Sequence, residues 1–401
     1  MVKEESMSSN LLRPGWEQLD SHELRLLLDA RIGGPGQYDS ESTDPNRIYL
    51  PLARENCRVV LTFSDKRIVG VEPGQAFDAA EWNRVAEEIE ASVLVGPTKV
   101  GREYSFSSYR VQGSWRGERS GVQILPPKPD AARPDVEDAE HPFILEFPLQ
   151  VSPFWPLTNH RRRREHRRLT LLLNTLLAGR TNLQPRRSNH FWGCFHRDGS
   201  GQEIRWVHNA YFAQLGKPVL DSPSPATCER LEEIAAERYY SQVTGLDGLG
   251  LRVPTDLDDS ICQYQRLDPA RRDEFDRAAF WLDMASRQWN TSVSASFAAL
   301  VSAVEALINT RGPGSTARFR AFFERYAPDA SLSSRRDQMY DVRSGILHGS
   351  DLMTIDQDID FGWDPPWWNE RELNSDLWAM TRIAVRNWLK DKAGPRATSG
   401  A

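Results

Sequence analysis

Two side chains near the C-terminal end of the sequence are of the types that phosphodiester chemistry uses. Arg343 and His348 lie five residues apart in the stretch QMYDVRSGILHGS, residues 338–350. A guanidinium binds two phosphate oxygens at once, and an imidazole gains and loses protons near neutral pH. The pair therefore indicates chemistry at a phosphodiester. The same spacing also occurs at Arg161 and His166, so the surroundings must identify the site.

A helix is expected to position both side chains. Met339, Val342 and Ile346 recur at steps of three and four residues, the spacing that gives a helix one buried face. Gly349 stands where a left-handed C-terminal cap is expected, and the helix dipole favours a histidine such as His348 in the last turn. The pattern thus predicts a helix that ends at the motif.

This motif resembles that of the Apea-like HEPN proteins of bacteria. Their signature helix carries the pattern Tyr-x-x-Arg-Ser-x-x-x-His-Gly, and the matching residues here are Tyr340, Arg343, Ser344, His348 and Gly349. The resemblance implies that the motif helix belongs to an all-α bundle.

The resemblance begins near Leu251 and covers roughly the last third of the chain, given ordinary domain sizes. Phe275, Ala279 and Trp281 are similar to the first long helix of the family, and the run SASFAALVSAVEAL, residues 294–307, to the second. The other helices of the bundle are expected over three stretches: residues 317–327, residues 331 or 333 to the motif, and residues 370–390.

A carboxylate is expected beside the motif arginine. An apolar stripe runs along the second helix, and Glu305 lies at its edge; the stripe consists of Val293, Phe297, Leu300, Val301, Val304 and Ile308. A partly buried charge requires a partner, and the resemblance implies that this partner is Arg343. A purely structural ion pair is the alternative interpretation.

The resemblance implies a metal-independent endoribonuclease that needs no cofactor. Arg343 would bind the scissile phosphate and His348 would transfer protons, with both residues supplied by each chain of a homodimer. Ser344 would donate a hydrogen bond, and Tyr340 would pack or stack on RNA. The family is associated with antiphage defence and toxin-like growth arrest. The alternative is a HEPN module that binds RNA or a nucleotide, or acts like an antitoxin, without cleavage.

Composition sets limits on the class of protein. With 401 residues, 39% of them hydrophobic and 26% charged, the chain is globular and long enough for more than one core. The net charge of −6 means that nucleic acid must bind to local patches. Four scattered cysteines, no signal-peptide pattern and no long apolar run predict a cytoplasmic protein without a membrane partner.

The predicted fold class is α+β, with a strand-rich mixed α/β domain before the helical bundle. The expected domains are 1–228, a connecting segment 229–270, the bundle 271–391 and a disordered tail 392–401. We interpret the first domain as a sensor or regulator that responds to a phage-derived or host trigger. Alternation and turn residues predict strands at 47–53, 57–65, 67–74, 102–111, 121–125, 142–152, 190–198 and 203–212, and helices at 78–91, 159–178 and 228–240.

A basic cluster lies in the helix expected over 159–178. Phosphate neutralisation supplies most nonspecific affinity for nucleic acid, so four of its arginines are candidate RNA-binding residues. A solvent-facing helix surface paired with the acidic loop at 126–142 is the alternative. The four candidates are Arg161, Arg164, Arg167 and Arg168.

Two further patterns offer metal ligands but fit poorly. His190, Cys194 and His196 share one face of a strand, which is a poor arrangement for tetrahedral coordination. A Gly-Ser pair followed by Asp356, Asp358 and Asp360 resembles the nucleotidyltransferase pattern. In that family the Gly-Ser pair follows a strand, whereas here it follows a helix. No metal site is therefore predicted, and the acids are expected to form a solvated loop.

Overall fold

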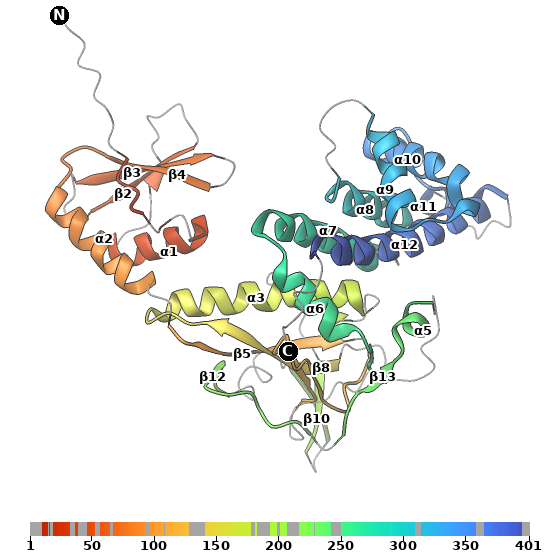
Figure 1. The fold of residues 1–401 in the computed structure, drawn as a ribbon, viewed down its shortest axis with the longest axis horizontal. Helices are drawn as coiled ribbons and strands as arrows, with labels where there is room; N and C mark the ends of the chain where they lie inside the picture. Colours follow the sequence, from red (N-terminus) through yellow and green to blue (C-terminus); the bar gives the residue numbers. More distant parts are fainter. Residues whose placement is uncertain are drawn as a thin grey trace, which may run out of the picture. The chain divides into compact units, whose positions relative to one another are not determined.

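A computed structural model shows the fold of the chain (Figure 1). Strands dominate the first part of the sequence and helices the last, so the architecture is α+β, as predicted. The structure describes residues 10–394 apart from 15, 17–18, 33–36, 39–45, 53–56, 65–66, 94–95, 108, 128–140, 178–180, 183–192, 199–200, 207–215, 228, 242–249, 290, 309–313 and 358–364.

Internal contacts divide the chain into two units. The first consists of Met1–Lys99 and Leu149–Arg164, and the second of Val100–Pro148 and Glu165–Ala401. Helix α3 (Trp155–Leu176) contributes residues to both units. The domain ranges expected from the sequence stay a prediction.

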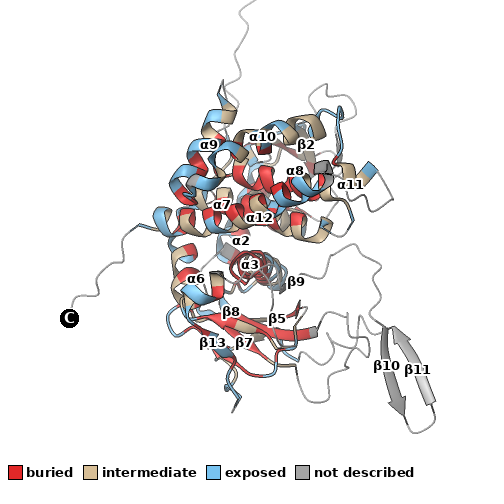
Figure 2. Ribbon diagram, turned by 90° about the vertical axis from the view of Figure 1, so that its right-hand side faces the viewer, coloured by how far each residue is buried: buried red, intermediate tan, exposed pale blue. Residues whose placement is uncertain are grey.

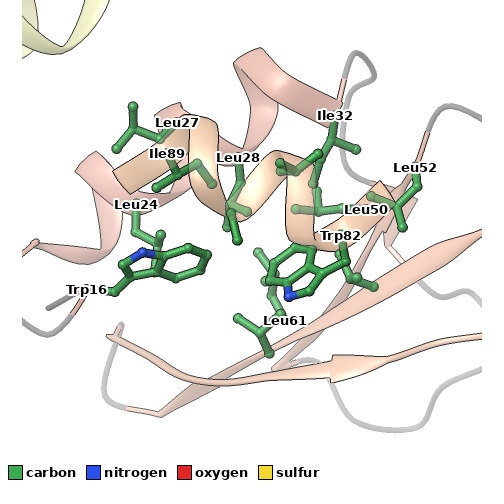
Figure 3. Packing of buried hydrophobic residues seen from close by; sticks show 14 of the residues in the cluster. Trp16, Leu24, Leu27, Leu28, Ile32, Leu50, Leu52, Leu61, Trp82 and Ile89 are labelled. Atoms are coloured by element: carbon green, nitrogen blue, oxygen red, sulfur yellow. The ribbon is translucent and has the colours of Figure 1, made fainter. Parts of the chain in front are cut away.

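The first unit packs two helices on an antiparallel sheet. The sheet has the order β1 (Gln37–Tyr38), β2 (Arg47–Pro51), β3 (Arg58–Ser64) and β4 (Arg67–Pro73), and the last three strands were predicted. Helices α1 (Ser21–Ile32) and α2 (Ala79–Val93) cover it. The core between them includes Trp16, Leu28, Leu61 and Trp82 (Figure 3). Helix α2 was predicted, whereas α1 was not.

The second unit contains a sheet of six strands, with the order β12-β5-β8-β7-β6 and with β9 paired to β5. The second half of α3 packs here, and every residue from 169 to 177 is buried (Figure 2). The strands are β5 (Thr98–Ser107), β6 (Trp115–Arg116), β7 (Gln123–Leu125), β8 (His141–Gln150), β9 (Thr181–Asn182) and β12 (Val219–Leu220).

Two strand pairs lie outside these sheets. Strands β10 (Gly193–Asp198) and β11 (Gly201–Trp206) form the predicted hairpin. Strand β13 (Glu232–Ile234) pairs in parallel with β14 (Arg252–Pro254). The prediction of a helix over 228–240 was therefore mostly wrong, because residues 232–234 form a strand that pairs with β14, about twenty residues later in the sequence. Only α5 (Ala236–Ser241) is helical in this stretch.

The end of the chain forms a helical bundle, as predicted. Asp268 and Ser292 accept hydrogen bonds from Arg271 N and Ala295 N and so cap α7 and α8. Phe275, Phe297 and Trp388 are fully buried in its core. Its elements are α6 (Leu257–Arg266), α7 (Pro269–Gln288), α8 (Val293–Glu305), α9 (Ser315–Tyr326), the 3₁₀ turn η2 (Ala330–Leu332), α10 (Ser333–Leu347), α11 (Thr354–Gln357) and α12 (Pro365–Lys392). Among the described helices, none combines the length and apolar character that crossing a membrane requires.

Candidate active site

The motif helix ends in a well-defined cap. His348 is the C-cap residue of α10, and Gly349 follows with φ of +67°, the left-handed conformation expected from the sequence. Gly349 N donates to Ile346 O at 3.1 Å and Ser350 N donates to Gly345 O at 3.0 Å. This pair of hydrogen bonds is a Schellman motif, which satisfies carbonyls that the helix leaves free. The cap fixes the backbone that carries His348.

Glu305 lies against Arg343, as expected. The Arg343 Nη2 atom donates to Glu305 Oε2 at 2.6 Å, and Tyr340 Oη donates to the other carboxylate oxygen at 3.3 Å. The Arg343 guanidinium also lies 5.7 Å from the centre of the Tyr340 ring. These contacts join the end of α8 to the middle of α10. Glu305 therefore fixes the orientation of Arg343.

Part of the Arg343 guanidinium has no partner within the described part of the chain. Its side chain is 21% exposed, and its Nε is buried without a hydrogen-bond partner there. An arginine that uses one edge to bind a carboxylate keeps further N–H donors for a phosphate. The pair with Glu305 therefore orients Arg343 without using all of its donors.

The two motif side chains point to different sides of α10. Five residues correspond to about 140° around a helix, so His348 does not share the face that Arg343 presents to α8. His348 is exposed at the end of the helix. Within the described residues, the structure groups Arg343 with Glu305 and Tyr340, and neither His348 nor Ser344 belongs to this cluster. Within a single chain the guanidinium and the imidazole therefore do not converge on one point.

Burial decreases along the apolar side of α10. Met339 is fully buried, whereas Ile346 is half-buried. Beyond it, Leu347 and Leu352 are each 50% exposed and flank His348 in the sequence. The motif therefore lies beside apolar surface that the described part of the chain leaves exposed.

The segment after the motif returns to the beginning of α8. Asp356 accepts hydrogen bonds from Val293 N at 3.0 Å, Ser294 N at 2.7 Å and Ser292 Oγ at 2.9 Å. Met353 N donates to Ser294 Oγ at 2.9 Å. Asp356 is therefore a helix cap, not part of the solvated loop expected from the sequence. Its use as a cap also weakens the nucleotidyltransferase interpretation. Asp358 and Asp360 lie outside the described residues.

Three of the four candidate RNA-binding arginines are engaged with carboxylates. Arg161 Nε lies 3.0 Å from Glu23, and Arg164 pairs with Glu23 and Asp20. Arg168 Nε lies 3.0 Å from Asp276. Arg167 is exposed. Glu23 belongs to α1, Asp20 directly precedes that helix, and Asp276 belongs to α7. Residues 128–140 of the acidic loop named in the sequence-based alternative lie outside the described residues.

One group of described residues has metal-ligand geometry. The potential ligand atoms of Asp20, Glu23 and His160 lie within 4.8 Å of one another. Both carboxylates already bind arginines of α3, which neutralises the charge that would attract a cation. For the strand pattern considered above, His190 and the side chains of Cys194 and His196 lie outside the described part of the structure.

Sequence reasoning missed two sets of residues at these places. Glu23 belongs to the unpredicted α1 and Asp20 directly precedes it, although Asp20 and the spacing of Leu24, Leu27 and Leu28 are helix signals. Asp356 gave no local signal, because its partners lie more than sixty residues away in the sequence. No protein-family model, curated protein or solved structure matches this chain.

Proposed function

We propose that this chain is a metal-independent endoribonuclease of the HEPN type that acts as a homodimer. The observation that supports the proposal most is the state of α10. It carries an arginine oriented by Glu305 and ends in a cap with an exposed histidine, and exposed leucines lie before and after that histidine in the sequence. An oriented cation and a solvent-accessible imidazole are what phosphodiester cleavage needs from a protein.

The chemistry requires two proton transfers. The ribose 2′-oxygen loses its proton and bonds to phosphorus while the bond to the leaving 5′-oxygen breaks, and that oxygen gains a proton. The products end in a 2′,3′-cyclic phosphate and a 5′-hydroxyl. One imidazole cannot accept and donate at the same moment, so two copies of His348 serve as base and acid. Arg343 stabilises the phosphorane anion.

A two-fold axis near the end of α10 would bring the required groups together. His348 and Arg343 of one chain are separated around the helix, so the second chain supplies the groups missing from the first. Covering Leu347 and Leu352 in the same interface would remove apolar surface from water. The dimer thus accounts for both the separation of the motif side chains and the exposed leucines.

The decisive experiment incubates the purified protein with total RNA in excess chelator. Wild type should cleave, whereas His348→Ala and Arg343→Ala should reduce the rate by at least 100-fold, and the new ends should carry cyclic phosphate. His22→Ala is the matched control, because His22 is exposed in the other unit. Cleavage that persists in both motif variants would overturn the proposal, and cleavage abolished by the chelator would indicate a metal enzyme.

The second candidate is a HEPN module that binds RNA or a nucleotide without cleaving it. The ion pair with Glu305 favours it, because a carboxylate neutralises the one motif cation within a single chain. In the same experiment, RNA binding that depends on Arg343 without any cleavage would support the binder.

The biological role that we propose is antiphage defence or toxin-like growth arrest in the cytoplasm. In this role the first part of the chain would respond to a phage-derived or host trigger. Expression in bacteria tests the role. Wild type should arrest growth, and His348→Ala should not. Growth arrest by both proteins at equal protein levels would contradict the proposed role.

A further inference from the structure

Two arginines of α12 line a hollow in the second unit. Arg382 and Arg386 are one helical turn apart, so their side chains lie on one face of the helix. Thr175 of α3, Tyr240 of α5 and Trp378 complete most of the lining. None of these residues belongs to the motif on α10. The hollow is therefore separate from the candidate active site.

Both guanidinium groups have buried N–H donors without partners. Arg382 Nε, Arg386 Nε and Arg386 Nη1 are inaccessible to solvent and lack a hydrogen-bond acceptor among the described residues. The Arg386 guanidinium lies 3.5 Å from the centre of the Tyr240 ring. The neighbouring carboxylate, Asp256, accepts instead from Tyr240 Oη at 3.3 Å and from Lys390 at 3.1 Å.

This arrangement contrasts with another arginine that contacts the same helix. Arg335 of α10 binds Asp376 and Glu372 of α12. Arg382 and Arg386 have no carboxylate within ion-pair distance in the described part of the chain. Burial lowers the pKa of the Arg382 guanidinium, because removing a cation from water disfavours its charged form. Two neighbouring cations without a counter-charge are costly, and a bound anion would stabilise both.

The size of the hollow restricts the anion. Its volume is about 50 Å³. One water needs about 10–15 Å³ on this measure, so the hollow has room for roughly four water-sized atoms, which is comparable to the four oxygens of a phosphate. Guanidinium groups form strong charge-assisted hydrogen bonds with phosphate oxygens, so a pair of neighbouring arginines suits a phosphate.

The edge of the hollow is apolar. Ile383 is 40% exposed, and Trp378 makes an edge-to-face contact with Trp289 at a ring distance of 5.8 Å. An organic group attached to the anion could pack on these side chains. We propose that this hollow binds the phosphate group of a small phosphomonoester, with Arg382 and Arg386 as its ligands.

Isothermal titration of the full-length protein at constant ionic strength tests the proposal with three probes. Phenyl phosphate should bind most tightly, inorganic phosphate several-fold more weakly, and acetate at least 10-fold more weakly than phosphate. Equal affinity for the two phosphates would overturn the organic part of the proposal. Tighter binding of acetate would overturn the choice of phosphate over carboxylate.

Variants locate the site. Arg382→Gln and Arg386→Gln should each weaken phenyl phosphate binding by at least 10-fold. Arg371 is an exposed arginine of the same helix, and Arg371→Gln should not change this binding.

If a glutamine variant fails to fold, Arg382→Lys keeps the charge and should still weaken binding several-fold. His348→Ala should bind normally, which separates this site from the proposed nuclease. An absence of saturable binding to wild type, or equal loss in Arg371→Gln, would overturn the proposal.

Discussion

The Glu305 carboxylate lies 2.6 Å from the Arg343 guanidinium, and the two side chains are only 16% and 21% exposed. The pair connects the last residue of α8 to α10, so the position of the motif arginine depends on a helix outside the motif. Its partial burial places the pair between a solvent-screened surface contact and a fully buried one.

We expect this pair to be energetically coupled. A double-mutant cycle with Glu305→Gln and Arg343→Gln should give about 1–2 kcal/mol from urea unfolding, because partial burial reduces solvent screening. The pair Arg320 and Asp337, each 45% exposed, is the control and should give less than about 1 kcal/mol. Equal coupling in the two cycles would show that burial of Glu305 has no energetic effect.

Gly349→Ala should disturb the cap that carries His348. An added Cβ would meet no atom within 4 Å, so the cost arises from the left-handed backbone alone, roughly 1 kcal/mol. Thermal unfolding measures this cost. The rate of RNA cleavage should also fall, because the cap carries His348. Gly394→Ala, with φ of +71° and equally open surroundings, is the control and should leave cleavage unchanged. A Gly349→Ala protein with full activity would mean that the cap does not position His348.

Leu347→Glu and Leu352→Glu should dissociate the proposed dimer. Two-fold symmetry places each change in the interface twice, and each lost leucine contact is worth about 1.5 kcal/mol, so the dissociation constant should rise roughly 100-fold. Light scattering after gel filtration measures the mass. Val69→Glu, 49% exposed in the first unit, should remain dimeric. A wild-type protein that is monomeric at micromolar concentration would remove the basis for a composite site.

Asp356→Ala should reduce stability in a pH-dependent way. Burial opposes ionisation of this carboxyl, but hydrogen bonds from Ser294, Val293 and Ser292 outweigh it and lower its pKa below the usual 3.8. The folded-state pKa is the lower one, so the contribution is complete above about pH 4 and is lost as the pH falls further. Denaturant unfolding should show a loss of about 1 kcal/mol at pH 7 that shrinks below pH 4.

Asp341→Ala is the control for this measurement, because Asp341 is exposed on α10. Its effect should be small at every pH. A difference between wild type and Asp356→Ala that stays constant from pH 7 to pH 3 would contradict the assigned role of the carboxylate.

Local patterns predicted much of the fold. The face of α2 formed by Trp82, Val85 and Ile89 is buried as its spacing indicates, and Gly349 adopts the left-handed cap conformation. The stretch around Glu232 could not be predicted in the same way. Its pairing with Arg252 in a parallel ladder is set by tertiary contacts. Local helix propensity contains no information about such contacts.

The same distinction applies to the sites. The apolar stripe indicated that Glu305 would be partly buried, and the family resemblance implied Arg343 as its partner. The partners of Arg161 and Arg168 lie on α1 and α7, and no local pattern connects them. Arg382 gave no signal at all, because an arginine in an amphipathic helix is indistinguishable from a solvent-facing one until α3 and α5 cover it.

Helix α8 contacts the motif segment at both of its ends. Asp356 holds its first turn and Glu305, its last residue, holds Arg343, so the chain from Arg343 to Asp356 and the 13-residue helix form a closed ring. The helix is about 20 Å long, so it holds the two attachment points of this ring at a constant separation. His348, the C-cap residue of α10, lies between these two attachments, so the segment that leaves its cap is bound to the same helix that orients Arg343.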